Sequence, residues 1–187
     1  MAPPAFPLKQ RYIKERSKPV SKAARFLWYV GPMVAWMGLI FTMSTEIGSA
    51  SHTAGLLYRL LQRFFPDWLA NATPEQLFEL HYWVRKGAHF TEYFILTVLA
   101  YRAFRYGEAW RHWRALGFSG SFSILYAFTD EFHQVFWASR TPSLRDVGID
   151  ALGAMTGFIL LAMLYAWQSV REAMHTAPMR ATTRATD

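Results

Sequence analysis

Ionisable side chains recur at helical spacing in one short stretch, RKGAHFTEYF, at residues 85–94. Lys86, His89 and Tyr93 fall on one face of a helix there, and Glu92 lies beside that face. A histidine beside a carboxylate can transfer protons, and a lysine can hold an anion. The chain then stays apolar to residue 101, so the pattern predicts reactive groups at the mouth of a membrane helix.

Two later stretches carry the same kinds of side chain, LYAFTDEFHQVF at residues 125–136 and RTPSLRDVGIDALGAMTG at residues 140–157. The candidates for acid–base chemistry or a proton relay across the three stretches are His89, Glu92, Asp130, Glu131 and His133. The candidates for ligand binding are Ser44, Lys86, Tyr93, Gln134, Arg140, Arg145, Asp146 and Asp150.

Four apolar runs must position these groups. Residues 26–45 and 151–170 each form 20 uncharged residues, which is long enough to cross a hydrocarbon core of about 30 Å. Two shorter runs lie between them, at residues 87–101 and 115–129, and Glu92 interrupts the first. Since soluble cores rarely contain apolar runs of such length, the sequence predicts an all-α fold, a four-helix transmembrane bundle.

The basic residues predict the orientation of this bundle. Fourteen of the 20 Lys and Arg residues fall in the two termini and in the 102–114 loop, and six fall in the 46–86 and 130–150 loops. Basic residues concentrate on the cytoplasmic side of a membrane, so both termini are expected there. This explains the net charge of +7 without a nucleic-acid partner.

The 46–86 loop is expected to carry short interfacial helices. Leucines and phenylalanines recur at helical spacing over residues 56–65, and Pro66 is expected to end that helix. Thr73, Pro74 and Gln76 form a helix-start signal, so a second helix should begin there and continue into the 87–101 run. We therefore divide the chain into a basic arm (1–25), a transmembrane domain (26–170) and a cytoplasmic tail (171–187).

This topology brings the candidate residues to the outer side of the membrane, where they would form one pocket. The sequence allows four interpretations of what this pocket does. The nearly balanced charges could form an ion-pair network that joins helices. His89, Glu92, Asp130 and His133 could bind a divalent metal such as zinc. The pocket could bind or modify the headgroup of an envelope lipid. In a non-enzymatic protein, its histidines and carboxylates could carry protons, or the chain could be a passive structural component of the membrane. The absence of cysteine excludes disulfides, thiolate ligands and a cysteine nucleophile.

The three stretches resemble the VanZ-like family of bacterial membrane proteins. The resemblance rests on Lys86, His89, Phe90, Glu92 and Tyr93, on the Asp130–Glu131–His133–Gln134 set, and on Arg140, Arg145, Asp146, Asp150 and Gly153; it covers residues 35–165. It implies a multi-pass protein of the bacterial plasma membrane that acts in the cell envelope, and its founding member is associated with resistance to the glycopeptide teicoplanin. The resemblance supplies no reaction and no cofactor.

Membrane lipids are the expected partners, among them a lipid-linked envelope precursor. Gly153 and Gly157 form a small-xxx-small pattern, which permits close approach of a second helix. The second helix could belong to another copy of the chain, giving an oligomer, or to the same bundle.

Overall fold

The computed structural model describes residues 21–138 and 143–183, with side chains described as far as His175. Helices account for nearly all of this part, which confirms the all-α prediction. The elements in chain order are α2 (Lys22–Tyr29), α3 (Gly31–Met43), the 3-10 turn η1 (Glu46–Gly48), α4 (Ala50–Phe64), α5 (Pro66–Asn71), α6 (Pro74–Arg102), the π turn η2 (Ala103–Gly107), α7 (His112–Gln134) and α8 (Leu144–Thr183).

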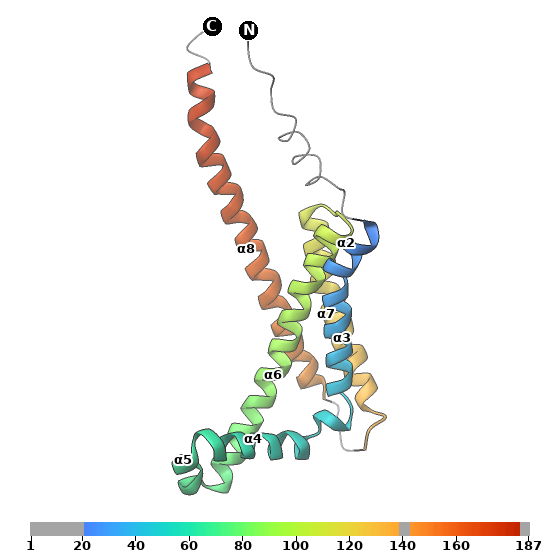
Figure 1. Cartoon of the computed structure of the whole chain (residues 1–187), viewed down its shortest axis with the longest axis vertical. Coiled ribbons are helices and arrows are strands. Elements are labelled where there is room, and N and C mark those ends of the chain that lie inside the picture. The colour runs from blue at the N-terminus through green and yellow to red at the C-terminus, as the bar shows by residue number, and fades with distance from the viewer. Residues whose placement is uncertain (1–20, 139–142, 184–187) are drawn as a thin grey trace, which may run out of the picture.

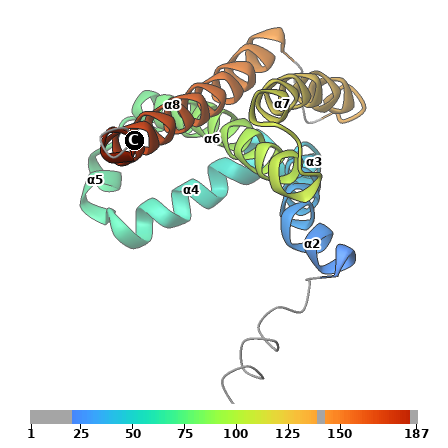
Figure 2. The same ribbon diagram turned by 90° about the horizontal axis from the view of Figure 1, so that it is seen from above.

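The helices α3, α6, α7 and α8 run upright side by side, and α4 and α5 lie across one end of them (Figures 1 and 2). We call this end the α4 end, and the opposite end, where α2 and η2 lie, the α2 end. The helix α8 packs mainly on α6 and α7. Its C-terminal half leans away from α3 and α7, and residues 163–175 are exposed.

The core lies where α3, α6, α7 and α8 meet. It is formed by Met33, Ile40, Tyr93, Leu96, Ala100, Ala103, Ala127, Val147 and Ala154. Two hydrogen bonds hold α3 in place: Trp36 donates its indole N–H to the backbone oxygen of Glu92 (2.9 Å), and the Tyr126 hydroxyl donates to the backbone oxygen of Met37 (2.9 Å). Both acceptors are backbone groups, so these bonds fix the position of α3 without using the carboxylates.

The start of α6 follows the helix-start signal in the sequence. The side chain of Thr73 accepts from the Gln76 N–H, and the Gln76 side chain accepts from the Thr73 N–H. Two of the unpaired N–H groups at the helix start are satisfied by this capping box. The prediction that a helix begins here and continues into the 87–101 run is confirmed, because α6 runs unbroken to Arg102.

Several boundaries differ from the sequence expectation. The run at 26–45 is divided at Val30 into α2 and α3, because Pro32 has no N–H for the helical ladder and starts a new helix best. Helix α4 covers residues 56–64 as expected, but Pro66 also begins α5. Helix α2 starts inside the segment assigned to the basic arm, and α8 continues through residues 171–183 of the assigned tail.

The two glycines of the small-xxx-small pattern lie against α6 of the same chain. A Cβ at Gly153 would collide with the backbone carbonyl of Phe90, and one at Gly157 would lie 3.1 Å from the backbone oxygen of Phe94. The surface considered for an oligomer contact is therefore occupied within the bundle by the α6–α8 interface. This close approach of the two backbones brings Asp150, one turn before Gly153, to α6.

Candidate functional site

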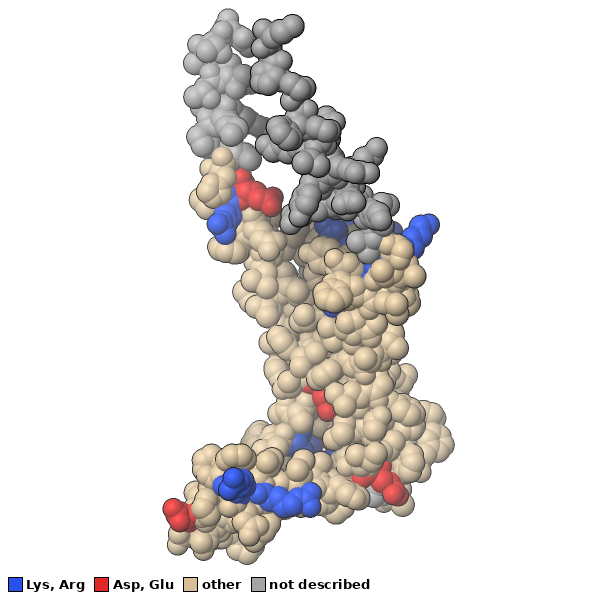
Figure 3. Space-filling model, in the orientation of Figure 1, with Lys and Arg blue, Asp and Glu red and all other residues tan. Residues whose placement is uncertain are grey.

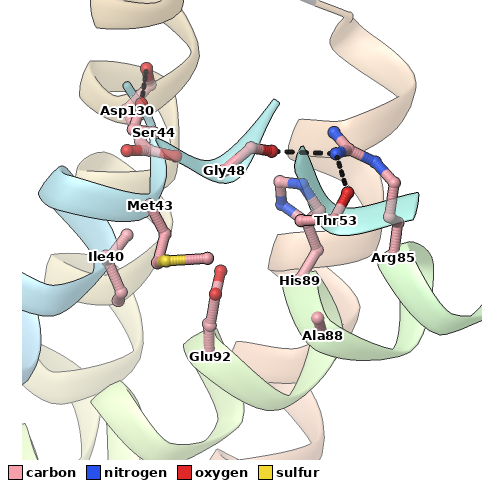
Figure 4. A pocket seen from close by; sticks show the side chains of 10 residues that line it. All are labelled: Ile40, Met43, Ser44, Gly48, Thr53, Arg85, Ala88, His89, Glu92 and Asp130. Carbon is pink, nitrogen blue, oxygen red and sulfur yellow. Dashed lines mark hydrogen bonds between the residues drawn. The ribbon is translucent and has the colours of Figure 1, made fainter. Parts of the chain in front are cut away.

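A cavity of about 50 Å³ opens at the α4 end between η1, α3, α6 and α7. Its lining residues are Ile40, Met43, Ser44, Gly48, Thr53, Arg85, Ala88, His89, Glu92 and Asp130 (Figure 4). A polar cavity needs only about 10–15 Å³ to hold a water molecule, so this one has room for a few waters or a small polar group.

Helix α6 contributes the largest share of the polar lining. Arg85, His89 and Glu92 follow one another at four and three residues, which places them on one face of the helix. The neighbouring face carries Tyr93, Leu96 and Ala100, which are fully buried against the other helices. Burial of this apolar face therefore fixes the rotation of α6 and turns the ionisable face into the cavity.

His89 is held by a carboxylate from α8. Its Nδ1 lies 3.2 Å from Oδ1 of Asp150, which is fully buried, and His89 itself is only 8% exposed. An ionised carboxylate can only accept, so Nδ1 of His89 donates and Nε2 is left as the acceptor. A buried carboxylate on Nδ1 that leaves Nε2 beside a cavity is the arrangement by which a histidine is prepared to take up a proton.

A second pair joins the same two helices one turn nearer to the α4 end. The ammonium group of Lys86 contacts Oδ1 of Asp146, and it lies 5.2 Å from the ring centroid of Tyr82. The charge of Lys86 is therefore largely balanced within the protein. Arg145 is exposed, with its guanidinium 6.0 Å from the same Tyr82 ring.

Helix α7 brings Asp130 to the cavity. Oδ2 of Asp130 accepts from the side-chain amide of Gln134 (3.3 Å), and its backbone oxygen accepts from the hydroxyl of Ser44 (3.4 Å). Ser44, at the end of α3, is 1% exposed and also lines the cavity. Asp130, Gln134 and Ser44 thus come together as one buried polar group, as their assignment to one pocket requires.

Glu131 and His133 take different positions from the other candidates. Oε2 of Glu131 accepts from the backbone N–H of Ser143 (2.8 Å), directly before α8 begins. His133 lies 3.4 Å from the hydroxyl of Ser44 through Nδ1, and its ring stacks on Phe41 at 4.2 Å. Neither residue lines the cavity, and their contacts join α7 to the chain segments on either side of it.

Arg85 and Thr53 line the cavity, although neither was among the candidates for acid–base chemistry or ligand binding. Arg85 donates to the backbone oxygen of Gly48 (2.9 Å) and to the Thr53 hydroxyl (3.2 Å), so it joins α6 to η1 and α4. Thr53 also lies 2.9 Å from Nε2 of His81, and burial, followed by the charge of Arg85, lowers the pKa of His81. The seven-residue spacing from Arg85 to Glu92 was a signal for Arg85; no local pattern pointed to Thr53.

The four candidate metal ligands do not form a coordination set, although His89, Glu92 and Asp130 line the same cavity. Within residues 21–138 and 143–175, no group of three or more His, Asp or Glu side chains is arranged so that it could hold a metal ion. His89 is directed to Asp150, whereas His133 is directed to Ser44 and Phe41. The structure therefore does not assemble the metal site that was considered for His89, Glu92, Asp130 and His133.

Tyr93 and Arg140 are the remaining candidates for ligand binding. Tyr93 is fully buried in the core, and its hydroxyl has no hydrogen-bond partner among the described residues. Arg140 lies outside the described residues. The site is thus one cavity with the Lys86–Asp146 and His89–Asp150 pairs beside it, built from residues of α3, η1, α4, α6, α7 and α8.

The fold and the site together define a helical protein with a polar site at one end of its bundle. Two stretches of the described chain are long and apolar enough to cross a membrane, residues 22–43 and 144–175. The VanZ/LLP1 family model matches residues 29–165, most of the chain, and the protein belongs to that family. No match was found among curated proteins or among solved structures.

Proposed function

We propose that this chain is a four-span protein of the bacterial plasma membrane, and that its α4-end cavity recognises or modifies the headgroup of an envelope lipid. The observation that carries the proposal is the cavity itself, which places Arg85, His89, Glu92 and Asp130 at one end of an apolar bundle. Ionisable groups at such a position cost free energy, and proteins retain them mainly where they act on a ligand or a proton.

The surface supports the membrane placement. In Figure 3, charged groups gather toward the two ends of the molecule, and the girdle between them is almost entirely uncharged. Large apolar side chains are exposed in this girdle, among them Val34, Leu125, Phe128, Ile159 and Met163. A water-soluble protein rarely exposes a continuous apolar surface of this extent, whereas a lipid-facing surface requires it.

The charges support an outward-facing cavity. Lys22, Arg25, Arg102, Arg105 and Arg114 all lie on α2, the end of α6, η2 or the start of α7, and so at the α2 end. The excess of basic residues marks the cytoplasmic side, so the α4 end faces outward. Lipid headgroups of the outer leaflet then lie at the level of the cavity, and the amphipathic α4 lies along the interface.

The chemistry divides between the cavity and its rim. Nε2 of His89 accepts a proton from a ligand hydroxyl or from water, and Asp150 stabilises the imidazolium that results. Arg85 and Arg145 hold a phosphate, because neither forms an ion pair with a carboxylate among the described residues. Lys86 is a weaker phosphate ligand than the sequence suggested, since Asp146 balances its charge.

Native mass spectrometry of the detergent-purified chain, supplied with a bacterial lipid extract, tests the proposal. We expect the wild type to retain a phospholipid or a polyprenyl-linked lipid. Arg85→Gln should reduce retention about tenfold or more, since a charge-assisted hydrogen bond contributes about 1.5–3 kcal/mol. The control Arg59→Gln removes the same charge from an exposed position on α4 that does not line the cavity. Lack of any retained lipid, or equal loss in both variants, would contradict the proposal.

Family membership also extends the proposal to glycopeptide resistance, specifically to teicoplanin. Expression of the chain in a susceptible Gram-positive host should raise the inhibitory concentration of teicoplanin, and Arg85→Gln should remove the increase. If expression leaves susceptibility unchanged while lipid retention is observed, the lipid-binding function holds and the resistance role fails.

A second candidate function, proton transfer across the bundle, is favoured by one observation. The hydroxyls of Tyr93 and Ser123 and Oδ2 of Asp150 are fully buried, on three different helices, and none has a hydrogen-bond partner among the described residues. Such groups form proton relays when they are bridged by water. Proteoliposomes with a pH gradient should then dissipate it faster than Tyr93→Phe proteoliposomes; equal rates would exclude this function.

A further inference from the structure

Arginines at the α2 end stack on aromatic rings. The guanidinium of Arg102 lies 5.6 Å from the ring centroid of Trp28 and 5.1 Å from that of Tyr29. That of Arg114 lies 5.1 Å from Trp110. Stacking holds a guanidinium in place without neutralising its charge, and it leaves the N–H groups on the edge of the plane able to donate to an anion.

A groove of about 640 Å³ lies at the same end of the molecule, between α2 and the C-terminal end of η2. Its lining residues are Lys22, Ala23, Arg25, Phe26, Leu27, Gly107 and Glu108. Arg25 fixes one wall, because its Nε and Nη2 both donate to the backbone oxygen of Gly107, at 3.1 and 2.8 Å. The acceptor is a neutral carbonyl, so the positive charge of Arg25 stays in the groove.

The groove combines positive charge with exposed apolar surface. Lys22 and Arg25 form no ion pair with a carboxylate among the described residues, and Glu108 is the single acidic residue in the lining. Phe26 is 51% exposed and Leu27 is 67% exposed directly beside the two basic residues. A binding partner must therefore supply a negative group and, next to it, an apolar one.

We propose that this groove binds an anionic phospholipid of the cytoplasmic leaflet. The phosphate lies between Lys22 and Arg25, with Arg102 near by on Trp28 and Tyr29, and the acyl chains lie over Phe26 and Leu27. Basic grooves at the cytoplasmic face of membrane helices bind such headgroups. The proposal rests on the membrane placement proposed above, but it does not depend on the α4-end cavity. Nucleic acid matches the charge but has no counterpart for the exposed Phe26 and Leu27.

Competition between two lipids tests the proposal. The purified chain is mixed with equal amounts of phosphatidylglycerol and phosphatidylethanolamine of the same acyl composition, and bound lipid is counted by native mass spectrometry. We expect the wild type to prefer phosphatidylglycerol. In the double variant Lys22→Gln, Arg25→Gln, the ratio of bound phosphatidylglycerol to bound phosphatidylethanolamine should fall about 30-fold. Each basic residue near an anionic group raises the affinity about fivefold.

Two controls separate lipid binding from general effects. The double variant Arg59→Gln, Arg63→Gln removes the same charge from α4 at the opposite end, and it should keep the preference. Arg25→Lys keeps the charge but loses the forked donation to Gly107, and it should also keep most of the preference. The comparison is repeated in the Arg85→Gln background, which weakens lipid binding at the α4-end cavity. The preference that remains there belongs to the groove, so failure of the lipid-headgroup function is distinguishable.

Three results would overturn the proposal. The wild type could bind both lipids equally, the Arg59 and Arg63 control could lose the preference as much as the groove variant, or Arg25→Lys could lose it completely. The last result would mean that Arg25 acts by holding α2 against Gly107. Retention of nucleic acid in place of lipid by the purified chain would overturn it as well.

Discussion

His89 and Asp150 show how one buried pair orients a side chain at the cavity. Asp150 is fully buried, and an ionised carboxylate in such a place is tolerated only with a hydrogen-bond donor. His89 supplies that donor at 3.2 Å and is itself oriented by the bond. The pair therefore both joins α6 to α8 and presents Nε2 of His89 as an acceptor at the cavity.

We predict that Asp150→Ala lowers the free energy of unfolding by about 3 kcal/mol, since removing one partner strands the other in the interior. Denaturant unfolding in detergent measures the loss. The control Glu46→Gln changes an exposed carboxylate at the same end and should cost less than about 0.5 kcal/mol. In a double-mutant cycle with His89→Ala, the two losses should be strongly non-additive. Simple additivity would show that the pair is not energetically coupled.

His112, at the start of α7, gives a prediction for pH. Its ring stacks on Tyr165 at 3.5 Å, and its Nδ1 lies 2.9 Å from the hydroxyl of Tyr101, so it joins α7 to α8 and α6. Burial, followed by the charge of Arg105, lowers the pKa of His112 below its ordinary value of 6.5. The unfolded chain then takes up the proton at higher pH than the folded one, so stability decreases as pH falls through 6.5.

The measurement is the thermal midpoint between pH 8 and pH 5. It should fall below pH 6.5 for the wild type, and the fall should be smaller for His112→Phe, which keeps a ring for stacking on Tyr165. An equal pH dependence in both proteins would assign the effect to other groups.

At the scale of the elements, the α6–α8 interface sets the geometry of the site. Gly153 lets the backbone of α8 approach Phe90 of α6 directly. Because His89 directly precedes Phe90 and Asp150 lies one turn before Gly153, a small separation of the two helices would break the His89–Asp150 hydrogen bond. The interface therefore acts on the cavity although Gly153 does not line it.

We predict that Gly153→Ala lowers the free energy of unfolding by about 3 kcal/mol, because the added methyl group collides with a backbone atom that cannot move freely. Gly148→Ala is the matched control on the same helix. A Cβ there meets no atom within 4 Å, so the change should be neutral or should stabilise α8 by about 1 kcal/mol. Similar effects of the two changes would contradict the close α6–α8 contact.

At the scale of the whole molecule, α6 and α7 decide between two and four membrane crossings. They carry polar side chains toward the α4 end, so composition alone selects residues 22–43 and 144–175 as spans. In the fold, however, all four helices run side by side, and the connection between α6 and α7 lies at the α2 end (Figure 1). This arrangement favours four crossings, with Asn71 and Glu108 on opposite sides of the membrane.

The absence of cysteine makes this topology testable with single substitutions. Asn71→Cys and Glu108→Cys are both exposed positions. We expect a membrane-impermeant maleimide to label Asn71→Cys in intact cells and Glu108→Cys only after the cells are permeabilised. Labelling of both variants in intact cells would exclude four crossings, because residues 71 and 108 would then lie on the same side of the membrane.

The sequence alone determined the features that depend on near neighbours in the chain. The Thr73 capping box starts α6 where the local pattern predicted, and α6 continues into the apolar run at residues 87–101 as expected. The class of fold followed for the same reason, because long apolar runs between polar segments favour helices. The three polar stretches also indicated which residues gather at one end.

Only the tertiary structure decided which of these residues contact one another. The sequence could not distinguish His89 from His133 by residue type or spacing. In the structure, His89 contacts Asp150 of α8, whereas His133 contacts Ser44 and Phe41. Arg85 entered the cavity because η1 and α4 fold back over α6, which no local pattern predicted. The physical reason is that packing between segments distant in sequence sets how each helix is rotated and which residues it contacts. At Gly153, the absence of a side chain is what lets α8 approach the backbone of α6.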